Sequence, residues 1–467
     1  MTASARTLSP TTASGAEQSW LATWARFAAE LTFEDLPAGV ADRTKQVLFD
    51  SIGAIAAGAQ EPETKDLVER LAALGGTSAV TTPVIGAHRR MPVGTAAFLN
   101  GTAGTMLEID EGNQFARGHP GIHVIPAALA AAERWNRSGR DLLLAIALGY
   151  EIGSRIGIAS RLRVTMHPHG TWGTVGAAVA VAKLAGADAA RMAETINVAS
   201  TLGLATSRQT MLQGGTVRNS FAGFSNEIGL RAWEMVEAGF VGEADGVATV
   251  YGAVIADDFR PDAMTLELGT RWEIARNYFK RHAACRYNHG ALDALGRIVA
   301  GAGGALEPDA IARIDVDTYV WAAQLSGQEP KNMLAAKFSL PFSLATFIVN
   351  GAASIEAFRE TARGDGTTRD LARRIFVVED PTLTAMLPGL RPARVRVTLR
   401  DGRVLAAEAT TNRGDTEDPY SADEIALKFM ETAGPVFGVE HARRILHATE
   451  ALDGARSVRD YAALLAA

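Results

Sequence analysis

Hydrophobic residues recur at helical spacing over most of this chain. From Trp20 onward they return every three or four positions, the period of an amphipathic helix. Helices that are apolar on most faces are buried on several sides or packed against a partner subunit, and residues 142–150 and 174–184 predict such helices. The helical segments expected after the first hundred residues are 125–135, 141–159, 174–184, 188–204 and 224–238.

The pattern changes in the second half of the chain. Residues 312–325 alternate between apolar and polar positions as strands do, and residues 391–411 predict a hairpin that turns at Asp401-Gly402. Residues 344–350 and 354–361 between them have helical spacing. From Ser421 the helical pattern returns, and Ser421 with Glu424 three positions later fits a capping box.

These changes predict a mainly α protein with an all-helical domain built from both chain ends and an inserted α+β domain. The expected divisions are a disordered tail over 1–17, helical segments over 18–275 and 420–467, and the α+β domain over 276–419. A short break with strand character is expected over 78–90. A chain of 467 residues is too long for one ordinary core, which agrees with two domains.

Composition excludes several kinds of partner. The net charge of −6 and the absence of a long basic run argue against nucleic acid. No apolar run reaches the roughly 18 residues that span a bilayer, so no membrane association is expected. The single cysteine, Cys285, cannot form an intramolecular disulfide, which favours a reducing compartment, and we expect a cytoplasmic protein.

The most concentrated group of titratable residues lies at 107–127, between two apolar helical segments. Glycines and a proline interrupt it, so it is predicted to form a loop. Titratable groups held between buried helices are typical of a catalytic site, and the alternative is a solvated loop between helices. Its charged and histidine residues are Glu108, Asp110, Glu111, Arg117, His119 and His123.

Three further clusters could carry chemistry. His167 and His169 precede a glycine-rich helix, an arrangement suited to an anion or to proton transfer, although a structural turn would use the same residues. Arg218 stands alone among small residues, as a carboxylate-binding arginine or a surface arginine does. Lys280 and His282 lie in a basic segment at the predicted domain boundary, where a ligand cleft or solvated charge is expected.

Cofactor motifs are missing from the sequence. It contains no G-x-G-x-x-G after a strand, no G-x-x-x-x-G-K-[ST] and no H-E-x-x-H, so we expect no nucleotide cofactor and no metal. His167 and His169 are the only weak alternative as metal ligands. Cationic groups beside histidines suit removal of a proton alpha to a carboxylate, followed by elimination, decarboxylation or reprotonation.

The order of these clusters resembles the 2-methylcitrate dehydratase family (the MmgE/PrpD family), which includes cis-aconitate decarboxylase and iminodisuccinate epimerase. The family's runs Asn-Gly, Leu-Asp-Phe-Asp-Asp-Thr, His-Pro-Ser, Phe-His-Pro and Lys-x-Tyr-x-x-Cys-x-x-x-His have counterparts here in the same order. The matching positions are Asn100-Gly101, Leu107–Gly112, His119-Pro120-Gly121, Met166-His167-Pro168 and Lys280 with Cys285 and His289, followed by Ala336–Phe342, Asp418-Pro419 and Lys428-Phe429.

The resemblance implies a helical domain with an α+β lid, a homodimer and cofactor-independent chemistry on di- or tricarboxylates. It assigns catalysis to His167, His119, Glu108 and Lys280. Substrate binding is expected from Arg218, Lys280, His169, His282 and Asp110. The chain departs from the family pattern at Glu108, Gly112, Gly121, Arg218 and His282, where Asp, Thr, Ser, Lys and Tyr are expected.

The prediction is therefore a cofactor-independent lyase, a dehydratase of a small di- or tricarboxylate. His167 is expected to be the main acid–base residue with His119 as its partner, while Arg218 and Lys280 hold carboxylates and Glu108 orients a neighbour. A decarboxylase or an epimerase remains open because all three reactions share a carbanion-like intermediate. A carboxylate-binding relative without catalysis is the alternative of a different class.

Overall fold

A computed structural model describes residues 19–74 and 78–466. The expected tail over 1–17 lies outside the described residues. Helices account for 59% of the chain and strands for 11%, which confirms the prediction of a mainly α protein with small sheets.

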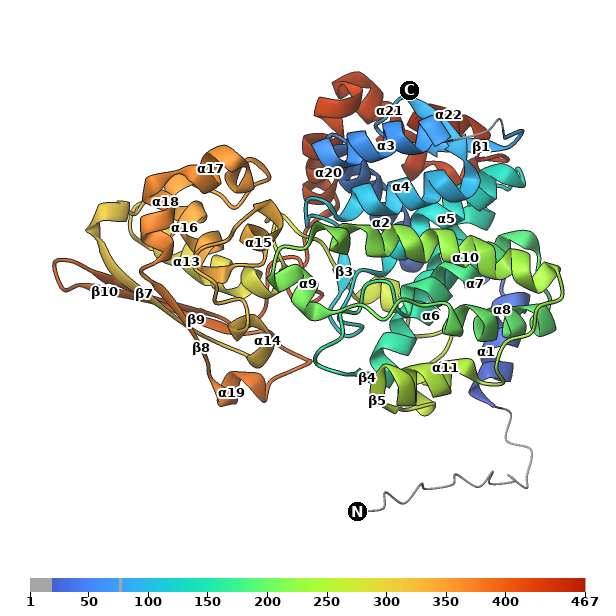
Figure 1. Ribbon diagram of the computed structural model, residues 1–467, viewed down its shortest axis with the longest axis horizontal. Coiled ribbons are helices and arrows are strands. Elements are labelled where there is room, and N and C mark those ends of the chain that lie inside the picture. Colours follow the sequence, from blue (N-terminus) through green and yellow to red (C-terminus); the bar gives the residue numbers. More distant parts are fainter. Residues whose placement is uncertain (1–18, 75–77, 467) are drawn as a thin grey trace, which may run out of the picture.

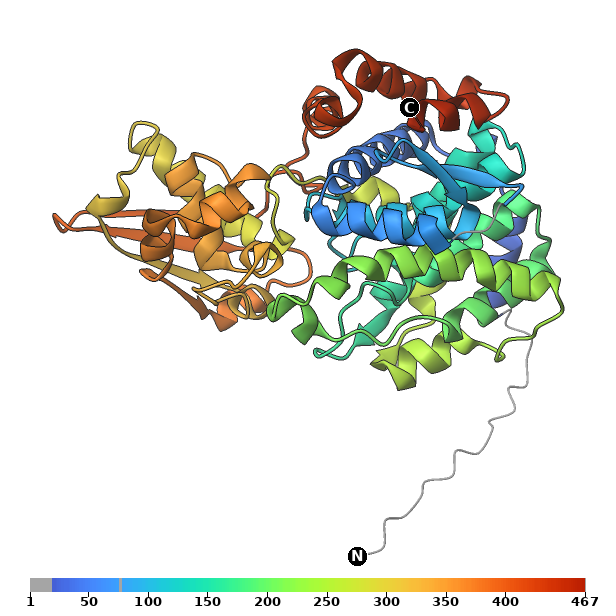
Figure 2. The ribbon, with the colours of Figure 1, turned by 45° about the horizontal axis from the view of Figure 1, so that its top comes forward.

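The larger part is helical and forms the right half of the view in Figure 1. Its hydrophobic core contains residues from Trp20 to Phe279 and again from Ile425 to Leu465. Helices α2 and α20, which lie far apart in the sequence, pack directly on each other, and Figure 2 shows the C-terminal helices lying over the first ones. The helices of this part are α1 (Trp20–Glu30), α2 (Ala38–Gly58), α3 (Pro62–Leu74), α4 (Val93–Thr105), α5 (Pro120–Arg134), α6 (Gly139–Ala159), α7 (Gly173–Ala185), α8 (Ala189–Thr201), α9 (Arg208–Leu212), α10 (Phe221–Glu237), α11 (Gly246–Thr249), α12 (Asp262–Thr265), α20 (Ala422–Phe437), α21 (Val439–Glu450) and α22 (Arg459–Leu465).

Short antiparallel strand pairs fix the loops between these helices. β1 (Thr81–Val84) pairs with β2 (Arg89–Pro92), where strand character was expected. β4 (Ser160–Leu162) pairs with β5 (Ala256–Phe259). The pair that matters most for function joins β3 (Gly112–Asn113) to β6 (Asn277–Tyr278), because it ties the charged loop after α4 to the segment that begins the second part of the chain.

The second part is built on a four-stranded sheet in the order β10-β9-β7-β8. Buried and more exposed residues alternate along β9, so one face of the sheet is covered and the other faces solvent. Helix α13 packs against β9 and β10, and α16 packs against β8 (Figure 1). The elements are α13 (His289–Gly301), β7 (Ile311–Thr318), α14 (Val320–Ala323), α15 (Met333–Lys337), α16 (Leu340–Asn350), α17 (Glu360–Gly364), α18 (Gly366–Ala372), β8 (Ile375–Glu379), α19 (Pro381–Thr384), β9 (Ala393–Leu399) and β10 (Val404–Ala409).

The predictions that depend on a local turn or helix cap are confirmed. β9 and β10 form the expected hairpin, and Gly402 adopts the left-handed backbone (φ 88°) that its turn requires. Ser421 and Glu424 form the expected capping box at the start of α20. Strand β8 was missed. It runs parallel to β7, and the helix predicted over 354–361 is instead a 3₁₀ turn (Glu356–Phe358) followed by α17.

The apolar helices α6 and α7 do not need a partner subunit to cover them, contrary to one of the two explanations that their sequences allowed. α6 and α7 are covered almost completely by neighbouring helices of the same chain, so their apolar faces do not require a second subunit. By length and composition α6 could cross a membrane, but 94% of its apolar window is buried inside the protein, as in the central helix of a globular core.

Candidate functional site

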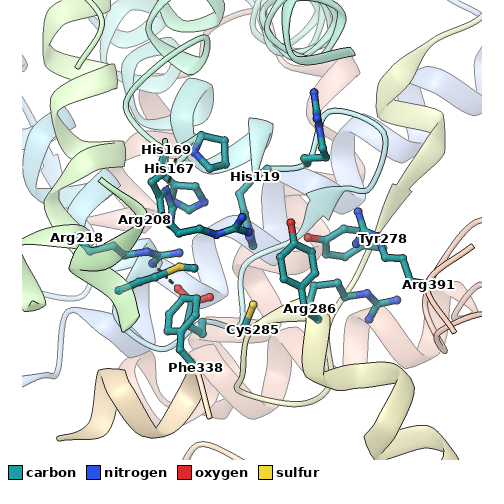
Figure 3. A pocket seen from close by; sticks show the side chains of 16 residues that line it. His119, His167, His169, Arg208, Arg218, Tyr278, Cys285, Arg286, Phe338 and Arg391 are labelled. Carbon is teal, nitrogen blue, oxygen red and sulfur yellow. Dashed lines mark hydrogen bonds and ion pairs between the residues drawn. The ribbon is translucent and has the colours of Figure 1, made fainter. Parts of the chain in front are cut away.

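One cavity lies between the helical part and the sheet-containing part, and residues from both line it (Figure 3). Its volume of about 50 Å³ accommodates a few water molecules, so a ligand of several carbon atoms enters only when the walls separate or rearrange. The polar side chains around it are Glu108, Arg117, His119, His167, His169, Arg208, Arg218, Tyr278, Arg286, Tyr287 and Arg391.

The loop after α4 places the acidic residues of the site. Glu108 has a left-handed backbone (φ 55°), a conformation that costs a residue with a side chain about 1 kcal/mol. Lys280 supports it by donating a hydrogen bond from Nζ to the Glu108 carbonyl oxygen at 3.0 Å. Strain that the surroundings maintain in this way is characteristic of functional loops.

His119 is held at Nδ1 by the same loop. Its Nδ1 lies 2.8 Å from Asp110 Oδ2 and 2.7 Å from the carbonyl oxygen of Glu111. The Glu111 carbonyl oxygen can only accept a hydrogen bond, so this contact assigns the proton of the neutral ring to Nδ1, with the Asp110 carboxylate beside it as an ion-pair neighbour. The lone pair on Nε2 is then available as a base, with the Asp110 carboxylate behind the ring to stabilise the imidazolium.

His167 has the opposite tautomer. The backbone N–H of His169 donates to His167 Nδ1 at 3.1 Å, so the proton of the neutral ring belongs on Nε2. Thr206 fixes this turn by donating from Oγ1 to the carbonyl oxygens of both His167 and His169 at 2.8 Å. His167 can therefore donate a hydrogen bond from Nε2, while His119 can accept a proton at its own Nε2.

Electrostatics keep His167 in the neutral form, in which its Nε2–H is a hydrogen-bond donor. Burial, followed by the positive charges of Arg218 and Arg208, lowers the pKa of His167 well below its ordinary value. The shift arises because the ring is desolvated and lies among cations. Burial and the charge of Arg218 also lower the pKa of His169. Both rings are neutral near pH 7.

Arg218 and Glu108 form a buried ion pair in close contact between Nη1 and Oε1. Arg218 Nε has no hydrogen-bond partner among the described residues, which leaves the guanidinium able to receive a carboxylate at that edge. Lys280 lies 3.7 Å from Glu108 Oε2 and 3.7 Å from Asp110 Oδ1. Lys280 thus neutralises the acidic loop from behind the cavity wall.

The structure brings most predicted site residues together and changes the place of some. Glu108, His119, His167, His169 and Arg218 line the cavity. Asp110 and Lys280 are not among the residues that line the cavity, and Asp110 is positioned to orient His119. Their predicted contacts with the substrate stay predictions.

His282 does not line this cavity, contrary to its prediction as a substrate-binding residue. It lies beside a different cavity with Arg281 and Lys428, and its Nε2 faces Asp293 Oδ1 at 3.8 Å. The residue two positions after Lys280 turns away because the chain bends there into the second part. His282 therefore lies outside the candidate site.

Four arginines complete the cavity without having been predicted as site residues. Arg117 and Arg286 belong to the charged segments of the sequence, whereas Arg208 and Arg391 carry no local signal. Cys285 also lines the cavity, and burial raises the pKa of its thiol to about 11, so it is not a thiolate nucleophile at neutral pH.

Two departures from the family pattern have a steric cause. A Cβ atom at Gly121 would lie 2.6 Å from Oε1 of Glu111, which accepts a hydrogen bond from the Gly121 N–H. A Cβ atom at Gly112 would collide with the Tyr278 hydroxyl group. In this chain the side chain of Glu111 occupies the space that a side chain at residue 121 would need, and the ring of Tyr278 occupies the space beside residue 112.

The described part of the chain contains no cluster of side chains arranged as metal ligands. No group of three or more His, Cys, Asp or Glu side chains is placed to hold an ion there. His167 Nδ1 is already an acceptor for a backbone N–H, so the paired-histidine alternative has lost one of its donor atoms.

Comparisons with known proteins agree with the residue-level resemblance. The MmgE/PrpD N-terminal domain matches residues 22–257 and the MmgE/PrpD C-terminal domain matches residues 282–454. A cis-aconitate decarboxylase-like protein of Aspergillus oryzae is 25% identical over 93% of this chain and 95% of its own length. A cis-aconitate decarboxylase of Aspergillus terreus is 23% identical over 90% of each chain. The chain belongs to the MmgE/PrpD family.

Proposed function

We propose that this protein is a cofactor-independent lyase that acts on a small di- or tricarboxylate, with dehydration as its reaction. The observation that carries the proposal is the opposed pair of histidines in one arginine-lined cavity. His119 is backed by Asp110 at 2.8 Å and offers a free Nε2, and His167 offers an Nε2–H. Elimination of water needs a base for the proton on carbon and a hydrogen-bond donor for the departing oxygen.

The reaction follows from these positions. A substrate carboxylate binds at the free Nε edge of Arg218, and His119 Nε2 takes the proton from the adjacent carbon. The electron pair of that C–H bond forms the new C=C bond as the C–O bond to the leaving hydroxyl breaks. His167 Nε2–H donates a hydrogen bond to the departing hydroxide oxygen. The proton that His119 took from carbon passes to this oxygen, so water leaves and both histidines return to the neutral form. Negative charge that develops on the carboxylate is stabilised by the fixed guanidinium of Arg218.

Decarboxylation is the second candidate, supported by the names of the relatives, which are cis-aconitate decarboxylases or like them. In that reaction a protonated histidine delivers its proton to a substrate carbon, a C–C bond breaks and CO₂ leaves. The same cavity then requires His119 to begin as imidazolium, a form that Asp110 stabilises.

Incubation with a panel of di- and tricarboxylates in D₂O tests the proposal. Loss of water, with deuterium exchange at the carbon next to a carboxylate, is the expected result. Release of CO₂ would replace dehydration by the second candidate, and exchange without a lyase product would indicate an epimerase. No reaction with any member of the panel, in a protein that binds them, would overturn the assignment of an enzyme.

A further inference from the structure

The cavity carries more positive charge than the proposed chemistry uses. Arg218 is paired with Glu108, and Arg286 is paired with Asp415 at 2.7 Å. Arg117, Arg208 and Arg391 also line the cavity, yet none forms an ion pair with a carboxylate of the described chain. Arg117 and Arg208 are half-buried, and Arg117 Nη2 donates to the carbonyl oxygens of Gly157 and Ser160, whereas Arg391 is buried. Buried charges in native proteins are normally paired, so a buried guanidinium group without a carboxylate partner, beside two further arginines, indicates a site for an anion.

Arg391 is the arginine of this group with the most hydrogen-bond donors left without a partner among the described residues. Its side chain is 2% exposed, and Nε and Nη1 have no hydrogen-bond partner within the described residues. Nη2 donates to the carbonyl oxygen of Gln114 at 2.7 Å, so a residue just before β9 reaches across to the loop of the helical part. The side chain is fixed in direction and still has buried donors to satisfy.

Aromatic rings hold the neighbouring guanidinium groups in place. Arg391 lies 5.6 Å and Arg208 lies 5.9 Å from the centre of the Tyr287 ring. Such contacts orient a cation without neutralising its charge. After burial, the charges of Arg391 and Arg208 contribute to lowering the pKa of Arg117, so the three groups repel one another in the empty cavity. A bound anion would relieve that repulsion.

The position of this cluster sets it apart from the place where the first carboxylate binds. Figure 3 shows Arg218 with His167 and His169 at one end of the cavity and Arg391 with Tyr278 at the other, with His119 and Arg208 between them. A ligand that reaches both ends must carry anionic groups at both ends.

We infer that Arg391, with Arg208 and Arg117, forms a second anion subsite that binds a distal carboxylate of the substrate and makes the enzyme selective for tricarboxylates over short dicarboxylates. This inference rests on the proposed function for the identity of the ligand. The subsite itself is defined by Arg391, whose free donors lie in the cavity wall.

Equilibrium binding of two inert ligands tests the subsite without turnover. Propane-1,2,3-tricarboxylate and succinate are titrated calorimetrically into the full-length protein and into Arg391→Gln. The wild type is expected to prefer the tricarboxylate, and Arg391→Gln is expected to weaken its binding by about tenfold or more, the range for a lost hydrogen bond to a charged group. Binding of succinate should change less than about threefold.

Matched variants separate binding from folding. Arg396→Gln makes the same substitution on the exposed side of β9 and should leave both affinities unchanged. Arg208→Gln changes a half-buried member of the subsite, so it remains informative if Arg391→Gln fails to fold. Its expected effect is again a selective loss of tricarboxylate binding. Inorganic phosphate serves as a competitor, and should displace neither ligand at equal concentration.

The outcomes distinguish this inference from the proposed function. Four outcomes would each overturn the tricarboxylate subsite. In the variants, these are an equal loss of affinity for both ligands or no loss of affinity for the tricarboxylate. In the wild type, they are a lack of preference for the tricarboxylate or displacement of either ligand by phosphate. Selective binding in a protein that converts no substrate would keep the subsite and remove the proposed lyase activity. Turnover of a substrate, without a selective loss of tricarboxylate affinity in the variants, would keep the proposed lyase activity and remove the subsite.

Discussion

Asp110 Oδ2 lies 2.8 Å from His119 Nδ1, and both side chains are buried. Burial alone would raise the pKa of Asp110, but the charges of His119 and Lys280 hold the pKa well below its ordinary value. The carboxylate therefore stays ionised over the whole physiological range. A fixed anion behind His119 favours proton uptake at Nε2, which makes this contact the basis of the proposed chemistry.

Replacement of Asp110 by asparagine should lower kcat by about a hundredfold or more, because the amide cannot stabilise the imidazolium and can favour the wrong tautomer. Steady-state kinetics measure the effect. Asp293→Asn is the matched control, since it alters another Asp–His contact, at 3.8 Å from His282, outside the cavity. A normal kcat in Asp110→Asn would show that His119 is not the base.

His167→Ala should lower kcat by at least about a hundredfold with a modest change in KM, because the hydrogen-bond donor that stabilises the departing oxygen is lost. His167→Gln should keep more activity than His167→Ala, since a glutamine amide can still donate a hydrogen bond near the position of Nε2. His282→Ala, outside the cavity, should behave like the wild type. If kcat is near normal in His167→Ala, the histidine is structural.

Arg218→Ala should raise KM strongly, because its contact with a substrate carboxylate exists before the reaction begins. The same change leaves Glu108 buried with only Lys280 nearby, so the free energy of unfolding should fall by about 3 kcal/mol. Arg218→Lys should keep substantial binding. Compared with Arg218→Ala, the double variant Glu108→Gln/Arg218→Gln should be more stable in urea unfolding but should keep the raised KM. If the KM also returned to the wild-type value, Arg218 would not bind the substrate.

The stability of the fold should depend on the protonation of Glu111. Burial raises its pKa to about 8 from 4.5. The folded state thus binds the proton more tightly, and the stability associated with that proton is lost as the pH rises from 4.5 through 8, by up to about 1.4 kcal/mol per pH unit. Urea unfolding between pH 5 and 8 should show a smaller loss in Glu111→Gln than in the wild type. Identical slopes would contradict a raised pKa.

Activity, once found, should survive exhaustive treatment with EDTA, since Arg218 and the arginines of the cavity supply the positive charge that a metal would otherwise provide. The assay is the rate before and after chelation and dialysis. Loss of activity that one divalent ion restores would reverse this prediction and make His167 and His169 ligand candidates again.

Local sequence signals predicted the elements whose geometry is decided locally. The hairpin at Asp401-Gly402 and the cap at Ser421 need only neighbouring residues, and the histidines of the site lie in short motifs. Arg391 gave no such signal because its partner, the carbonyl oxygen of Gln114, is 277 positions away. Strand β8 was missed because exposure along it does not alternate, and a parallel pairing with β7 depends on the intervening helices.

Gly121 and Glu111 also restrict how this protein can diverge. The carboxylate of Glu111 fills the space beside Gly121, with Oε1 2.6 Å from where a Cβ atom would lie. A lineage could regain the family's serine at residue 121 only after Glu111 had shortened to aspartate, because the reverse order passes through an overcrowded intermediate. The two positions should therefore change in a fixed order, and a serine introduced at residue 121 while Glu111 is still present should be deleterious.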